Sequence, residues 1–157
     1  MLFNARSLVN KFSDFDAILD CQRKSVHLIA VTETWFSKIN PARSYPLPSY
    51  RQFHRDRQDR TGGGIAVYVR QDISSREVST EHIPGHLEVM WLHLKSSRLV
   101  RLLKEVYVCV LYSPPRSQHK EDLTDHIINM VDIIRSFVDN PAFIIMGDFN
   151  DVDSDVL

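Results

Sequence analysis

The chain has 157 residues, enough for one domain or part of one, and its 43% hydrophobic and 25% charged residues are ordinary for a globular protein. The formal net charge of −1 gives no overall basic footprint, so any attraction to nucleic acid must come from a local patch. No apolar run reaches the ~18 residues of a membrane span, and no secretory signal is recognisable, so we expect an intracellular protein with no membrane partner.

The first half of the chain contains one helical pattern and several short apolar runs. Four apolar residues recur at helical spacing and predict a helix over residues 8–23: Leu8, Phe12, Phe15 and Leu19. Short apolar runs predict strands over residues 26–31, 50–54 and 65–69. Two breaks separate these strands, a proline-rich loop at 41–48 and a glycine turn at 62–64.

The second half of the chain repeats this arrangement. Alternating residues over 87–94 predict a half-buried strand, and the apolar run 106–112 predicts a strand that ends at two prolines. An apolar stripe predicts a helix over residues 119–138, and the run 143–146 predicts the last strand. Between these elements, Ser96 to Glu105 mixes basic and apolar residues, which fits a long hairpin, a helical insertion, read-through of a wrongly assigned gene junction or a basic DNA-contact patch.

This order of elements predicts the fold class. Several strands follow one another, and helices occur only near the two ends, which favours an α/β sandwich of packed sheets with helices outside. Cys21 falls in a helical pattern and Cys109 in a strand pattern, without the spacing of a zinc site, so we expect two buried, reduced thiols.

Polar side chains stand at the ends of the expected strands. They are Asn4, Glu33, Tyr112, Asp148 and Asn150, the last two within the string Gly147-Asp148-Phe149-Asn150. A carboxylate can orient water or hold a metal ion, and an amide can donate to a phosphate oxygen. Each residue alone also fits a solvated strand exit or a packing aromatic. Because strand ends meet at one rim of a sandwich, their shared placement favours a functional site.

Six segments, in this order along the chain, together resemble the endonuclease/exonuclease/phosphatase family. They are similar above all to the endonuclease domain of non-LTR retrotransposons of the jockey and chicken-repeat type. The segments are residues 4–11, Thr32-Glu33-Thr34-Trp35, residues 55–69 with the triple glycine, Glu88-Val89-Met90-Trp91, Tyr112-Ser113-Pro114-Pro115 and Gly147-Asp148-Phe149-Asn150. The resemblance spans nearly the whole chain and implies a four-layer αββα sandwich, incomplete at the C-terminus, over residues 1–157.

The resemblance also implies a role for each strand-end residue. Glu33 binds Mg²⁺ or Mn²⁺, and Asn4 lies beside it to hold the metal or a phosphate oxygen. Tyr112 places its hydroxyl on the scissile phosphate, Asp148 orients the attacking water, and Asn150 donates to the developing charge. Metal charge and aligned donors stabilise the crowded, more negative transition state of phosphodiester hydrolysis. Arg55 fits either a support for these carboxylates or a structural ion pair.

The sequence also departs from the family pattern. The family ends on a Ser-Asp-His motif whose histidine contacts the phosphate, and no Ser-Asp-His occurs among these 157 residues. We therefore expect an incomplete DNA-nicking domain, nuclear if functional and inactive alone, whose uncovered strands allow self-association. The alternatives are a non-catalytic interaction module and a member of the family's phosphatase branch.

Overall fold

The computed structural model describes residues 1–22, 25–57, 62–79, 81, 83–95 and 105–150. Within these ranges the chain forms eight strands, two α-helices and one 3-10 turn. The strands are β1 Leu2–Asn4, β2 Leu28–Thr32, β3 Tyr50–Arg55, β4 Ile65–Arg70, β5 Ser74–Glu77, β6 Glu88–Lys95, β7 Val106–Tyr112 and β8 Ala142–Asp148. The helices are α1 Leu8–Asp20 and α2 Lys120–Phe137, and the 3-10 turn is η1 Ala42–Ser44. No helix in the described ranges is long and apolar enough to cross a membrane.

The strands form two four-stranded sheets, one in each half of the chain. The first has the order β1-β2-β4-β3 and the second the order β5-β6-β7-β8. In each sheet one outer strand runs parallel to its neighbour, β1 beside β2 and β8 beside β7, and the other pairs are antiparallel. The carboxyl ends of β1 and β2 therefore lie together, as do those of β7 and β8.

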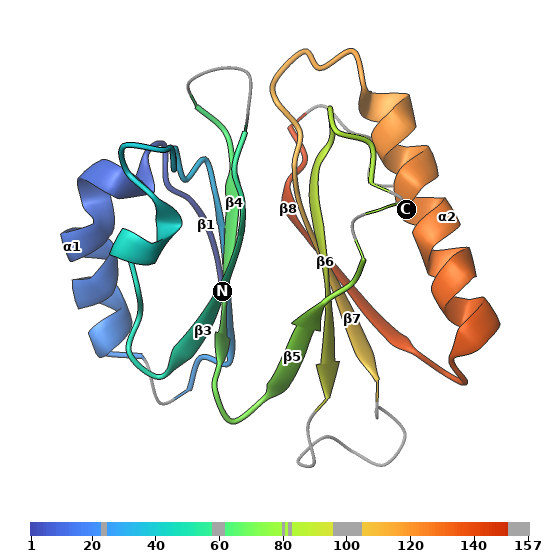
Figure 1. The fold of residues 1–157 in the computed structure, drawn as a ribbon, viewed down its shortest axis with the longest axis horizontal. Helices are drawn as coiled ribbons and strands as arrows, with labels where there is room; N and C mark the ends of the chain where they lie inside the picture. Colours follow the sequence, from blue (N-terminus) through green and yellow to red (C-terminus); the bar gives the residue numbers. More distant parts are fainter. Residues whose placement is uncertain (23–24, 58–61, 80, 82, 96–104, 151–157) are drawn as a thin grey trace.

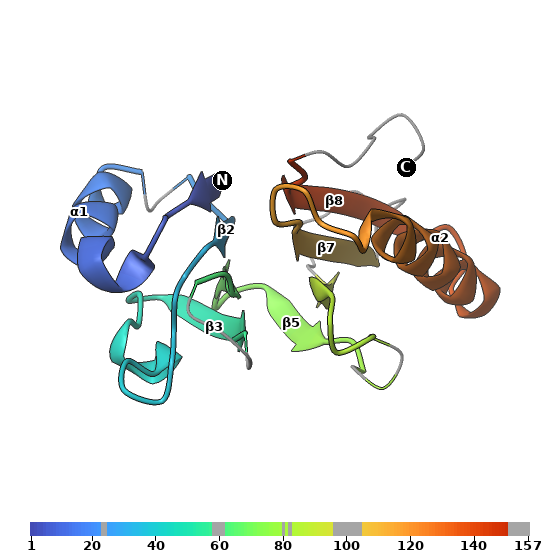
Figure 2. The same cartoon turned by 90° about the horizontal axis from the view of Figure 1, so that it is seen from above.

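Figure 1 shows four layers, with α1 outside the first sheet, the two sheets facing each other, and α2 outside the second sheet. Figure 2, turned by 90°, shows the same separation of the two halves. Three apolar clusters fill the spaces between the layers. One packs α1 on its sheet, one packs α2 on its sheet, and the third lies between the sheets. The α/β sandwich predicted from the sequence is confirmed.

The strand β6 illustrates how the layers bury both faces of a sheet. Val89 and Trp91 pack toward α2, whereas Met90 and Leu92 pack toward the first sheet. The predicted strand is present, but the expectation that it is only half-buried is wrong. Both of its faces are covered, because a helix lies on one side and a second sheet on the other.

Element boundaries agree with the sequence within a few residues, with three omissions, of which the first is the three-residue strand β1. The strand β5 has the polar sequence Ser-Ser-Arg-Glu and gives no apolar run. The 3-10 turn η1 lies inside the proline-rich loop. The expected stripe on α2 is buried at Leu123, Ile127, Met130 and Ile134, but Phe137, at the last turn, is 83% exposed. The segment Ser96 to Glu105 lies, apart from Glu105, outside the described residues.

Both cysteines are free thiols, as expected, but only one is buried. Cys109 lies inside β7, and its burial raises the pKa of its thiol. The prediction of a buried Cys21 is wrong. The helix α1 ends at Asp20, so Cys21 lies in the turn that follows and is exposed.

Candidate active site

The polar strand ends of the two sheets meet at one rim of the sandwich. Asn4 pairs with Thr32 at the carboxyl ends of β1 and β2, and Tyr112 pairs with Asp148 at the ends of β7 and β8. The end of β3, the start of β4 and the start of α2 lie at this same end, which is the upper edge in Figure 1. The chain topology thus gathers residues that are far apart in the sequence.

One amide group joins the two sheets at the centre of this rim. The Nδ2 group of Asn4 donates to Oε1 of Glu33 at 2.8 Å and to Oδ2 of Asp148 at 2.5 Å. Glu33 follows β2 in the first sheet, whereas Asp148 ends β8 in the second. Two carboxylates that share one hydrogen-bond donor repel each other, and a bound cation would relieve that repulsion.

The backbone around these carboxylates is held in an unusual conformation. Glu33, Trp35 and Asn150 have φ angles of 56°, 60° and 45°, in the left-handed region that non-glycine residues rarely adopt. The carbonyl of Glu33 accepts a hydrogen bond of 2.9 Å from the amide of Ser7, which ties the loop after β2 to the loop after β1. Strained residues of this kind persist only where neighbouring contacts fix them, and they concentrate at functional sites.

Glycine at position 147 is required by the close approach of β8 to β7. A Cβ atom added there would lie 2.0 Å from the carbonyl oxygen of Leu111. The φ angle of 150° at this residue also disfavours a side chain. Gly147 therefore lets β8 reach the rim, where it presents the carboxylate of Asp148.

Tyr112 is buried beside these carboxylates. Burial raises the pKa of its hydroxyl to about 12, and the negative charges of Glu33, Glu88 and Asp148 add to this effect. The guanidinium of Arg57, 5.7 Å from the centre of the ring, acts in the opposite direction. The hydroxyl is thus protonated at neutral pH and can donate a hydrogen bond.

Asn150 also lies at the rim, although its amide group has a local partner. Its Nδ2 group donates to the carbonyl of Ser113 at 2.7 Å, and its backbone amide donates to Oδ1 of Asp148 at 3.3 Å. The first bond links the loop after β8 to the residue after β7, and the second holds Asn150 against the end of β8. The structure therefore brings together all five strand-end residues named from the sequence.

An ion pair that the sequence did not single out forms the next part of the rim. Arg57 donates through Nε to Oε1 of Glu88 at 2.7 Å, and the backbone amide of Gly64 donates to Oε2 of Glu88 at 2.6 Å. The side chains of Arg57 and Glu88 are only 15% and 12% exposed. Both residues lie in segments that carry the family resemblance, and this resemblance is the sequence feature that could have identified them.

Arg55, proposed from the sequence as a support for the carboxylates or a structural ion pair, lies at the end of β3. Burial lowers the pKa of its guanidinium, against the opposing effect of Glu77 and Glu88. Its charged neighbours are thus on the second sheet, at β5 and β6. No described contact joins Arg55 to Glu33 or Asp148.

A cavity of about 930 Å³ opens beside the Arg57–Glu88 pair. Its walls come from the end of β3, the loop before β6 and the segment that leads into α2, and they include Arg55, Arg57, Arg116, His54, His86 and His119. A hydrogen bond to Asp56 raises the pKa of His54 above its usual value, which favours the charged imidazolium. The carboxylates of Asp56, Glu77 and Glu88 line the same cavity, so its walls carry both charges, and the arginines offer donors for an anionic ligand such as a phosphate group.

The donors at the rim suit a hard divalent cation. Glu33 and Asp148 offer carboxylate oxygens, which are the ligands that Mg²⁺ and Mn²⁺ prefer. Asn4 presents its Nδ2 group to both carboxylates, while its Oδ1 accepts a hydrogen bond of 3.2 Å from the backbone amide of Arg6. In this arrangement the carboxylates are the available ligands, and Asn4 orients them.

Three comparisons place this fold among known proteins. The family model described as "Endonuclease/Exonuclease/phosphatase family" matches residues 1–156. No curated protein sequence matches the chain significantly. The solved structures that match include a D. rerio TDP2 humanized by 14 mutations, with a TM-score of 0.64 at 14% identity, covering 99% of this chain and 67% of that one.

Two further solved structures share the fold. The 3'-5' exonuclease NExo from Neisseria meningitidis has a TM-score of 0.63 at 16% identity, covering 95% of this chain and 56% of that one. D. rerio TDP2 complexed with single-strand DNA product has a TM-score of 0.61 at 14% identity, covering 95% and 57%. The chain therefore spans 56% to 67% of the length of these three proteins. With nearly its whole length matched by the family model, the chain belongs to the endonuclease/exonuclease/phosphatase family.

Proposed function

We propose that this chain is the front part of a divalent-metal-dependent DNA endonuclease domain of the non-LTR retrotransposon type, which hydrolyses phosphodiester bonds. The observation that carries the proposal is the double hydrogen bond of Asn4 to Glu33 and Asp148. It holds two carboxylates from different sheets at one exposed rim, beside a buried, protonated tyrosine. Phosphoryl chemistry uses hard metal ligands and hydrogen-bond donors placed side by side in this way.

Members of this family generally depend on a divalent metal ion. At this rim Glu33 would hold Mg²⁺ or Mn²⁺, with Asn4 positioning the carboxylate, and the ion would supply positive charge to the phosphate oxygens. Asp148 would orient the attacking water and take up its proton as the water oxygen bonds to phosphorus, while the bond from phosphorus to the leaving DNA oxygen would break and the charge of the ion would stabilise that oxygen. Tyr112 would donate a hydrogen bond from its hydroxyl to a phosphate oxygen, and Asn150 would add an amide donor on rotation away from Ser113.

DNA is the proposed substrate, for two reasons. One neighbour in fold is described as complexed with a single-strand DNA product, and the cavity beside the rim is lined by Arg55, Arg57 and Arg116. The retrotransposon origin rests on the segments Thr32-Glu33-Thr34-Trp35 and Arg55-Asp56-Arg57 with the triple glycine. A retrotransposon nuclease would act on nuclear DNA.

We further propose that the 157-residue chain nicks DNA slowly by itself. The family uses the histidine of a Ser-Asp-His motif at the phosphate, and no such motif occurs in this sequence. Acid–base or electrostatic help of that kind typically contributes ~10²–10⁴-fold in rate. Misplacement of Asp148 or Asn150 by a small distance would lower the rate further.

The test is nicking of supercoiled plasmid with Mg²⁺, by this chain and by a version extended with the Ser-Asp-His segment of a complete family member. We expect nicking by the extended version and its loss in the Asp148→Ala variant of that version. Asp125→Asn, an exposed carboxylate change on α2, is the matched control and should keep the activity.

The other outcomes separate the alternatives. Strong nicking by the short chain, lost on Asp148→Ala, would contradict the proposed slow rate. Metal-dependent DNA binding without cleavage by either version would favour a non-catalytic interaction module. Release of inorganic phosphate from a phosphomonoester without nicking would favour the phosphatase branch.

We also propose that the chain self-associates along β8. The strand β8 is the outer strand of its sheet in the described residues, and Ile144 on it is 43% exposed. An exposed apolar edge strand can pair with a second copy of the chain. Sedimentation should then show a dimer that Ile144→Lys converts to monomer, and a wild-type monomer at high concentration would contradict the proposal.

A further inference from the structure

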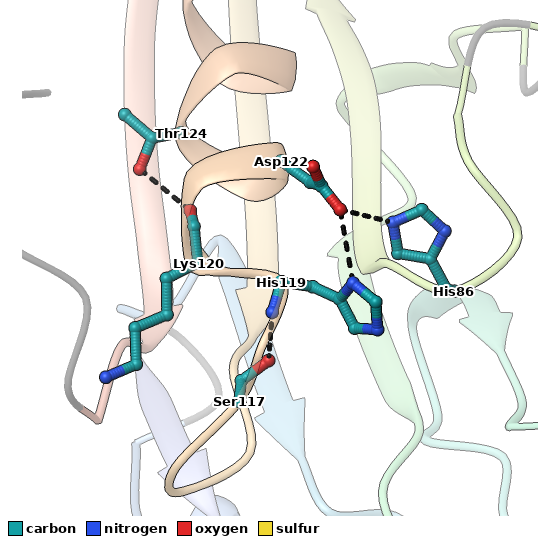
Figure 3. A network of polar contacts seen from close by, with 6 residues as sticks. All are labelled: His86, Ser117, His119, Lys120, Asp122 and Thr124. Carbon is teal, nitrogen blue, oxygen red and sulfur yellow. Dashed lines mark hydrogen bonds and ion pairs between the residues drawn. The ribbon is translucent and has the colours of Figure 1, made fainter.

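A second group of potential metal ligands lies away from the rim carboxylates. His86 comes from the loop before β6, and His119 and Asp122 lie at the start of α2. Figure 3 shows the two imidazole rings and the carboxylate turned toward one another across the gap between the loop and the helix. The segment that leads into α2 is held locally, because the backbone amide of His119 donates to Oγ of Ser117 at 3.2 Å.

The spacing of these side chains is close to that of ligands around one ion. Nε2 of His86 and Nδ1 of His119 each lie 3.1 Å from Oδ2 of Asp122, and all three ligand atoms lie within 4.8 Å of one another. For metal–ligand bonds of ~2.1 Å, neighbouring ligands of an octahedral or tetrahedral ion lie about 3.0–3.4 Å apart. Only the two nitrogens need to adjust for the three atoms to share an ion.

The donor types indicate which ion this group would prefer. Two imidazole nitrogens with one carboxylate oxygen suit Zn²⁺ and related transition metals, whereas Mg²⁺ prefers oxygen ligands alone. The rim, by contrast, offers the oxygens of Glu33 and Asp148. The side chains of His86, His119 and Asp122 are 44%, 49% and 55% exposed, so an ion can reach them from solvent.

We propose that His86, His119 and Asp122 form a binding site for a transition-metal ion with the preference of Zn²⁺, separate from the rim carboxylates. The ion would link the loop before β6 to the start of α2. Because His86 and His119 also line the 930 Å³ cavity, the bound ion adds positive charge to the cavity wall. Three protein ligands leave a coordination position for water or an anionic group.

The experiment is calorimetric titration of the untagged chain with Zn²⁺. We expect one site whose affinity falls more than ~100-fold in His86→Ala and in His119→Ala, beyond the loss typical of residues that only orient a ligand. His27→Ala, which removes another exposed histidine, and Asp125→Asn should leave the affinity unchanged. Circular dichroism of each variant checks that the exposed substitutions preserve the fold.

A second arm separates this site from the rim. Glu33→Gln should leave Zn²⁺ binding intact, and the absorption spectrum of bound Co²⁺ should report nitrogen ligands that disappear in His86→Ala. Unchanged affinity in both histidine variants would overturn the proposal. Loss of Zn²⁺ binding in Glu33→Gln would assign the ion to the rim carboxylates instead and would also overturn it.

Discussion

The rim and the cavity wall beside it are built in different ways. At the rim, Glu33 and Asp148 sit at the ends of strands in two packed sheets, under positive φ angles or close strand contact, and Asn4 holds them together. At the wall, His86 and His119 line the cavity, and with Asp122 they form a group of exposed side chains on a loop and at the start of a helix. The geometry of the rim depends on strand register within the two sheets, whereas the geometry of the group His86, His119 and Asp122 depends on a loop and a helix start.

The two regions therefore differ in rigidity. A residue at a strand end inherits the position of the whole sheet, so its side chain is fixed before any ligand arrives. Ligands on a loop and a helix start need to be ordered by the ion they bind, which lowers the affinity they provide. Substitutions confined to one region should therefore leave the other region unchanged.

The largest expected effect is that of Gly147→Ala. The added Cβ would meet the backbone of Leu111 at 2.0 Å, so β8 has to shift, and we expect a loss of ~3 kcal/mol or more in unfolding free energy. Urea unfolding measures it. Gly85→Ala, in the loop beside His86 with nothing within 4 Å of its added Cβ, is the control and should cost little.

The Gly147→Ala variant should also change metal binding at the rim alone. In the folded part of the Gly147→Ala population, Asp148 should be displaced and Mn²⁺ binding at the rim weakened, with Zn²⁺ binding at the wall retained. Equal stability of the two alanine variants would show that β8 can move without cost and that the rim is not fixed by its register.

A smaller loss is expected for Glu88→Gln. The change leaves Arg57 without its charged partner in a mostly buried position, which should cost about 2 kcal/mol in unfolding free energy. Asp72→Asn breaks the more exposed Arg70–Asp72 pair, whose carboxylate is 39% exposed, and should cost less than ~1 kcal/mol. A similar cost for both substitutions would show that the Arg57–Glu88 pair does not organise this side of the rim.

Features encoded in local sequence patterns could be predicted, whereas features that depend on the packing of distant segments could not. The strand-end residues could be found because apolar runs mark each strand and polar residues follow, and the parallel pairs then bring Asn4 and Asp148 to one edge. The burial of β6 on both faces and the presence of β5 could not be predicted, because both depend on how the layers pack around the sheet. His86 and His119 are 33 residues apart in sequence with no motif between them, so only the tertiary structure brings them together.

At neutral pH the smallest expected effect is that of Tyr112→Phe, which changes stability only at alkaline pH. The pKa of Tyr112 is raised from 10.0 to about 12 by burial, so between pH 10 and 12 the unfolded chain loses this proton while the folded chain keeps it. The contribution of Tyr112 is thus complete below pH 10 and is lost as pH rises toward 12. Tyr112→Phe should flatten the decline of stability over this range and leave it unchanged at pH 8, as followed by urea unfolding. An equal decline in the variant would contradict the burial of the hydroxyl.

Titration of the chain with Mn²⁺, followed by paramagnetic broadening of backbone NMR signals, tests the proposed metal site at Glu33 most directly. Because Glu33 and Asp148 bond to the same amide, we expect residues 32–34 and 147–150 to broaden together at low Mn²⁺ concentration. Glu33→Gln should abolish the broadening of both segments, whereas Glu121→Gln, on the exposed face of α2, should leave it intact. Broadening of one segment alone, or an unchanged titration in Glu33→Gln, would contradict a metal ion bound at Glu33 beside Asp148.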